Sequence, residues 1–205
     1  LGAEVQHLLG LGDAADHRAR KAAPAAGERE DRHGHRMLGD AQFDQRAVDG
    51  EHQAGIATPS QANLWLIAFD VKEGVDRARL RGLMRVWTQD ARRMSKGEAP
   101  RTDLEPEMYE APANLTFTVG LGEGFFTAAD REDEKPEWLE PLPEYSTDEL
   151  RDEWNDGDLC LQICCDDPLM LSHAARFMIK NGAPYLDVRW VQMGFLNARG
   201  AKEPT

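Results

Sequence analysis

The sequence predicts an α+β domain in which four antiparallel strands form one sheet and two main helices cover one of its faces. Two observations support this fold class. Four segments have the length and pattern of strands, and two amphipathic segments separate the first strand from the second and the third from the fourth. The chain has 205 residues, of which 41% are hydrophobic, so it can bury the core of one domain.

The first strand and the first helix are the most regular segments. The run NLWLIAFDV at 63–71 is almost entirely apolar and is bounded by polar residues, which predicts a buried strand. A helix is predicted at about 75–95 because apolar residues recur on one face, and Gly97 is a natural stop. Arginines fill the opposite face, which we interpret as solvated rather than phosphate-binding. The apolar face comprises Leu80, Leu83, Met84, Trp87, Ala91 and Met94.

Alternation predicts the second and third strands. In NLTFTVG (114–120) and GDLCLQICC (157–165), aliphatic or aromatic side chains alternate with threonine, cysteine or glutamine. Residues 130–156 between them are acidic and contain several prolines. We therefore expect a surface loop there, with a short helix after Ser146.

A helix is also predicted at about 168–181. Asp167 is a good N-cap, Pro168 suits the first helical position, and Gly182 is expected to end the helix. We expect Phe177 to face the sheet, as Trp87 does in the first helix.

The last strand lies in YLDVRWVQMGF (185–195). Leu186, Val188 and Trp190 are expected to share a face, after which the alternation slips by one residue. Such a slip indicates a β-bulge or a bend. The complete order of elements is the ferredoxin-like, split βαβ plan.

Composition excludes several classes of function. The net charge is -13 and the pI is about 4.9, which argues against a nucleic-acid partner because phosphate binding needs a basic surface. No apolar run is long enough to predict a membrane-spanning helix. Cys160, Cys164 and Cys165 lack paired metal-ligand spacing, so we interpret them as strand thiols.

Residues 1–49 are predicted to be a mostly disordered or non-native leader. They contain one aromatic residue, four of the six histidines and no regular periodicity, so they cannot bury enough apolar surface to offset the entropy of ordering. They do not have the pattern of a signal peptide, which suggests a cytoplasmic location for the chain as it stands. The HGH triplet at 33–35 offers two metal ligands, but no third lies nearby, so no metal site is predicted.

The glycine-rich stretch VGLGEGFF (119–126) follows a predicted strand, as a dinucleotide-binding turn does. Gly120, Gly122 and Gly124 have the spacing GxGxG rather than GxGxxG, and no parallel βαβ unit is evident. We favour a structural role, in which the glycines permit a sharp turn and seat Phe125 and Phe126 in the core.

Four motifs resemble the N-terminal half of a dye-decolourising peroxidase, in the bacterial branch related to deferrochelatase/peroxidase. The resemblance covers about residues 50–199. It implies haem b as cofactor, hydrogen peroxide and dyes or phenolic compounds as substrates, and two ferredoxin-like domains, with haem held mainly by the second. The motifs are GEHQAGIATPSQANLWLIAFDV, LTFTVGLGEGFF, GDLCLQICCDDP followed by HAAR at 173–176, and VRWVQMGF.

The resemblance also limits which residues can be assigned to the chemistry. The family's GxxDG motif, which carries the distal acid, is absent from this chain, and the distal arginine and proximal histidine come later still. We therefore assign no catalytic residue, cofactor ligand or metal ligand here. His52 is expected to be structural, with a role near the haem pocket or domain interface as the alternative. His173 is expected to be a packed or exposed helix residue.

Three functional interpretations stay open. Residues 50–205 form the N-terminal domain of a truncated peroxidase that is inactive alone, or a half-enzyme that needs a separately encoded haem domain, or a ferredoxin-like binding or assembly module. We expect a frameshift or a fragmentary gene model, because the chain begins with Leu1 and lacks the twin-arginine signal of exported relatives. The oligomeric state, including homo-oligomers, is left open.

Overall fold

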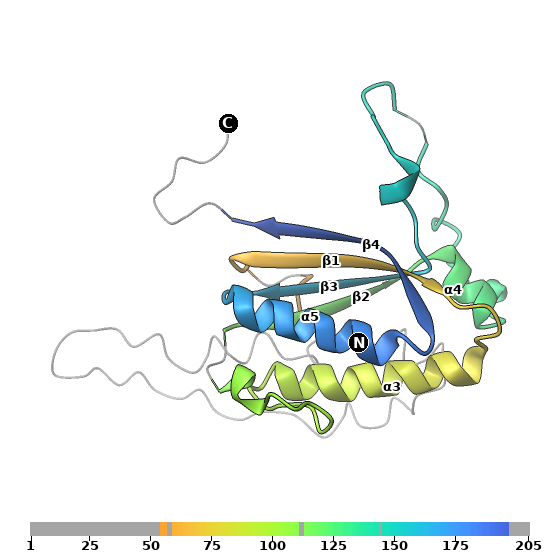
Figure 1. The fold of residues 1–205 in the computed structure, drawn as a ribbon. Coiled ribbons are helices and arrows are strands. Elements are labelled where there is room, and N and C mark those ends of the chain that lie inside the picture. The colour runs from red at the N-terminus through yellow and green to blue at the C-terminus, as the bar shows by residue number, and fades with distance from the viewer. Residues whose placement is uncertain (1–53, 57–58, 111–112, 144, 197–205) are drawn as a thin grey trace, which may run out of the picture.

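A computed structural model describes residues 54–56, 59–110, 113–143 and 145–196. In these residues one antiparallel sheet has the strand order β2-β3-β1-β4, and the helices α3 and α5 both lie on the same face of it (Figure 1). The predicted ferredoxin-like plan is confirmed, because β3 lies between β1 and β2 and pairs with both. The strands are β1 (Asn63–Val71), β2 (Thr116–Leu121), β3 (Leu159–Cys165) and β4 (Leu186–Phe195).

Both main helices begin and pack as predicted. The Asp76 carboxylate caps α3 (Arg77–Met94) by accepting from the Arg79 backbone N–H. Asp167 caps α5 (Pro168–Gly182) in the same way, through the Met170 N–H at 2.7 Å. All six apolar residues predicted for the inner face of α3 are buried. Trp87 is fully buried against Phe69, with 5.6 Å between ring centroids, and Phe177 is buried too.

The glycines after the two helices have different roles. Gly97 has a φ of 76° and ends α3 as predicted. Gly182 is still helical, and a Cβ there would lie 2.9 Å from Cζ2 of Trp87. α5 therefore ends at Gly182 as predicted, but this glycine is not a left-handed cap, and its small size is needed for close packing of α5 on α3.

The predicted bulge in β4 exists, but it changes the expected facing of one residue. Ala68 pairs with Trp190 and Phe69 pairs with Val188, so Arg189 is the extra residue of β4. Leu186 and Val188 therefore face the helices, whereas Trp190 faces the opposite side. The expectation that all three share a face is wrong, because the extra residue lies one position before the slip that is visible in the sequence.

The described residues also include several short helices. The helix α4 (Glu123–Ala128) stands where the sequence predicted only a sharp turn. The acidic loop contains two 3-10 turns, and one of them follows Ser146 as expected. The 3-10 helices are η2 (Pro106–Tyr109), η3 (Glu132–Glu134) and η4 (Asp152–Trp154). Among the described residues, no helix is long and apolar enough to cross a membrane.

Candidate functional site: the open face of the sheet

The open face of the sheet is the side opposite α3 and α5. The strand registers place one alternating set of side chains there, and most of them are half-buried rather than sealed in a core. The set mixes apolar groups, thiols and amides, in contrast to the mostly apolar helix side. Its members are Leu64, Leu66, Ala68, Asp70, Thr116, Thr118, Gly120, Cys160, Gln162, Cys164, Asp187, Trp190, Gln192 and Gly194.

Part of the lead-in segment 50–61 lies across this face. The Thr118 hydroxyl donates to the Ala54 carbonyl at 2.7 Å, and the Gln162 amide donates to the Gly55 carbonyl at 3.4 Å. Gly55 has a φ of 102°, and a Cβ there would collide with the Thr118 hydroxyl. Ala54 and Gly55 therefore lie on the open face over β2 and β3. His52, three residues before Gly55, lies outside the described residues.

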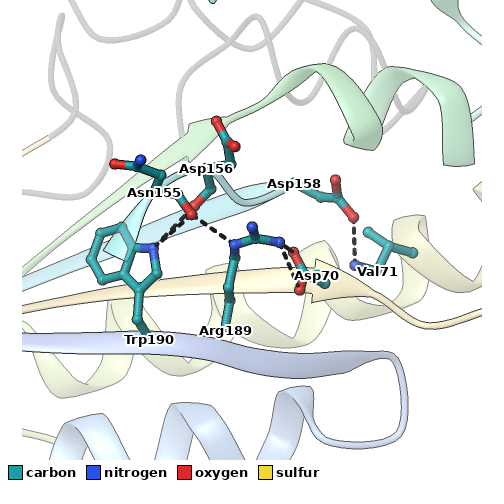
Figure 2. Close-up of polar contacts among 7 residues, drawn as sticks. All are labelled: Asp70, Val71, Asn155, Asp156, Asp158, Arg189 and Trp190. Atoms are coloured by element: carbon teal, nitrogen blue, oxygen red, sulfur yellow. Dashed lines mark hydrogen bonds and ion pairs between the residues drawn. The ribbon is translucent and has the colours of Figure 1, made fainter. Parts of the chain in front are cut away.

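The bulge in β4 holds the end of the acidic loop on the open face. Figure 2 shows Arg189 and Trp190 directed toward the same loop. Arg189 Nε donates to the Asn155 carbonyl at 2.7 Å, and its guanidinium lies 3.3 Å from both carboxylate oxygens of Asp70. Trp190 Nε1 donates to the carbonyls of Asn155 and Asp156 at 3.3 and 3.2 Å.

These contacts were not predicted from the sequence. The only signal for them was the slip in alternation near residue 190, which indicated the bulge but not its partners. Because a bulge turns consecutive side chains toward one side, it lets two neighbouring residues of β4 bind one loop. Arg189 and Trp190 therefore fix the end of the acidic loop against β4.

The glycine motif proves structural, as predicted. The Gly122 N–H donates to the Asp158 carbonyl at 2.8 Å, and a Cβ on Gly122 would collide with the Gly157 carbonyl. Asp158 in turn accepts from the Val71 N–H at 2.7 Å, as Figure 2 also shows. Protein backbone and the Asp158 carboxylate thus lie directly against Gly122 and Gly124, so the glycines are needed for close packing. Phe125 and Phe126 are buried.

His173 is the only histidine among the described residues, and both of its ring nitrogens are engaged. Nε2 lies 2.8 Å from Asp103 Oδ2, and Nδ1 lies 3.1 Å from Glu105 Oε2. The side chain is buried under the loop before β2, away from the open face. The expectation of a packed helix histidine is confirmed, and this residue does not fit the axial position of haem.

The cysteines do not fit that position either. Burial raises the pKa of the Cys160 and Cys164 thiols, and it raises the pKa of Cys165 to about 11. A thiolate is the form that ligates iron, and burial disfavours it in all three. Within the described part of the chain, no three His, Cys, Asp or Glu side chains are grouped to hold a metal ion.

Comparison with known proteins identifies the family. The family model for the N-terminal part of Dyp-type peroxidases matches residues 53–196. The chain belongs to the Dyp-type peroxidase family. The predicted resemblance to the N-terminal half of this family is thereby confirmed.

Relatives of the Dyp-type family align with most of the chain. It is 34% identical over 174 residues to the deferrochelatase of Escherichia coli strain K12, covering 80% of this chain and 41% of that protein. It is 36% identical over 161 residues to the dye-decolorizing peroxidase of Thermobifida fusca, covering 74% and 37%. The Dyp-type peroxidase of Cellulomonas bogoriensis superposes with a TM-score of 0.73 and 45% identity, covering 77% and 44%.

The three comparisons match a similar share of the chain, between 74% and 80%. The chain spans less than half the length of the curated relatives and of these solved structures. One of the solved relatives, DtpA from Streptomyces lividans, has been described in its ferric state; it is 34% identical, with a TM-score of 0.69.

Proposed function

We propose that this chain is the N-terminal half of a haem-dependent peroxidase that oxidises dyes and phenolic compounds with hydrogen peroxide. Membership of the Dyp-type family carries the proposal, together with a match that covers the N-terminal part of longer relatives. In this proposal the cofactor is haem b, and the second half supplies its axial ligand.

The open face is where we propose that the second half packs. One face of the sheet is already covered by α3 and α5 (Figure 1). The other exposes part of Leu64, Leu66 and Trp190, which are apolar groups that gain free energy when removed from water. The segment 54–56 and the loop 155–158 border this surface and give it a defined shape.

A peroxidase needs iron with an open coordination position, an acid–base group for the proton, and a positive group for the departing oxygen. The residues described here do not supply this set. His173 is engaged by two carboxylates, and Arg189 is engaged by Asp70 and Asn155. We therefore expect this chain alone to bind haem weakly and to lack specific peroxidase activity.

A haem titration tests this expectation. Hemin is added to the full chain and to His52→Ala, and the Soret band and peroxide-dependent dye bleaching are recorded. We expect a weak, broad band that the substitution leaves unchanged. A sharp stoichiometric band that His52→Ala abolishes would make His52 a ligand and would contradict the proposed division between the halves.

A further inference from the structure

A buried cluster of titratable groups lies on the helix side of the sheet, apart from the open face. His173 of α5 is 7% exposed and lies between Asp103 and Glu105 of the loop before β2. The Tyr109 hydroxyl donates to Asp103 Oδ2 at 3.1 Å, and the Tyr109 ring meets His173 edge-on, with 5.5 Å between centroids. These contacts join the segment 103–109 to α5.

The arrangement requires two donors from one ring. A neutral imidazole has a single N–H, whereas the imidazolium ion has two. Because both ring nitrogens of His173 face carboxylate oxygens, only the charged ring can donate to Asp103 and Glu105 together. The neutral ring keeps one of these hydrogen bonds and loses the other.

Asp103 is the more firmly held of the two partners. Burial opposes its ionisation, but hydrogen bonds from the Glu105 N–H, from His173 and from Tyr109 outweigh burial and lower the pKa of this carboxyl. Glu105 is more exposed, with 57% of its side chain accessible, and its carboxylate pairs with His173. Loss of the ring proton should therefore free Glu105 first.

The neighbouring charges reinforce the requirement for a cation. Asp90 of α3 is buried close enough to interact with Asp103 and Tyr109, and it accepts from the Asn181 amide at 3.0 Å. Burial raises the pKa of Asp90. Arg93 offsets part of this negative charge, but its guanidinium also binds Glu98 at 3.2 Å. When protonated, His173 is a cation that directly faces Asp103 and Glu105 in this acidic cluster.

We propose that His173 is a protonation-dependent latch that fastens the segment 103–109 to α5. The charged ring holds both Asp103 and Glu105. The neutral ring releases Glu105 and loosens the segment, which precedes β2 in the chain. The latch would make the position of this loop depend on the protonation state of the ring, independently of haem and of the second half.

Amide hydrogen exchange tests the latch in the full chain. Protection factors, corrected for the intrinsic pH dependence of exchange, are compared at pH 5.5 and pH 8 for the Glu105 and Met108 amides. These amides donate to Asp103 Oδ1 and to the Glu105 carbonyl. We expect protection to fall about tenfold at the higher pH, because one hydrogen bond between charged groups is lost.

Two variants make the test specific. Glu105→Gln removes the charge that the second N–H of the His173 ring binds. Because Glu105 is exposed, this variant should fold normally. We expect amide protection in this variant to be nearly independent of pH. Glu123→Gln removes an unrelated ion pair with Lys135, and it should keep the wild-type fall. Equal protection at both pH values in the wild type, or an unchanged fall in Glu105→Gln, would overturn the proposal.

Discussion

The two faces of the sheet differ in how they are completed. The helix side is filled by side chains of this chain alone, such as Ile67, Leu161 and Trp87, all fully buried. The open side holds half-buried side chains, and it is bordered by backbone carbonyls that accept from Thr118, Arg189 and Trp190. The difference indicates that hydrophobic packing stabilises the first face, whereas hydrogen bonds from the strands hold loops at the border of the second.

The largest expected effect comes from the helix side. Trp87→Ala should destabilise the protein by about 3–5 kcal/mol, because it leaves a cavity beneath Phe69. Trp190→Ala on the open face is the matched comparison and should cost clearly less, because its ring is only half-buried. Denaturant unfolding of both variants measures the difference. Equal losses would show that the two faces are packed to the same degree.

Alanine substitutions at two glycines test where the backbone is closely packed. Gly122→Ala should destabilise by about 1–3 kcal/mol, because its methyl group meets the Gly157 carbonyl. Gly82→Ala in α3 meets no atom within 4 Å and should stabilise by about 0.5–1 kcal/mol through helix propensity. Thermal unfolding distinguishes the two signs. A stabilising Gly122→Ala would contradict the role given to the glycine motif.

Two buried carboxylates should have opposite effects at acid pH. The pKa of Asp103 is lowered in the folded state, so its contribution is present above its unfolded value, near 4, and is lost as pH falls through the lower folded value. Burial raises the pKa of Asp90, so protonating this carboxyl at acid pH removes the cost of burying its charge and favours the folded state. Unfolding measured between pH 2 and 6 should show a shallower acid loss for Asp103→Asn and a steeper one for Asp90→Asn.

The smallest global effect should come from the contact in Figure 2. Arg189→Ala removes a partly exposed ion pair with Asp70, which contributes about 0–1 kcal/mol to stability. The local effect should be larger, because the Asn155 carbonyl also loses its closest donor. Trypsin should therefore cleave after Arg151 faster in this variant than in Lys72→Ala. Equal cleavage rates would show that the bulge does not hold the loop.

Local patterns were enough to predict much of this fold from the sequence. The strand at 63–71 and the inner face of α3 follow from periodicity, and the start of α5 follows from the Asp167–Pro168 pair. The missed features depend on contacts between distant residues. The role of Gly182 depends on Trp87, and the partners of His173 lie about 70 residues away. The facing of Trp190 depends on where β1 accommodates the extra residue.

The open face is proposed to pack against a second, haem-carrying half. The most direct measurement adds this chain to the separately expressed C-terminal half of the Thermobifida fusca peroxidase with hemin, and records the Soret band against that half alone. We predict a sharper band with the wild-type chain and with Val86→Asp, on the exposed side of α3, but not with Leu66→Asp on the open face. A band that Leu66→Asp leaves unchanged would contradict the claim.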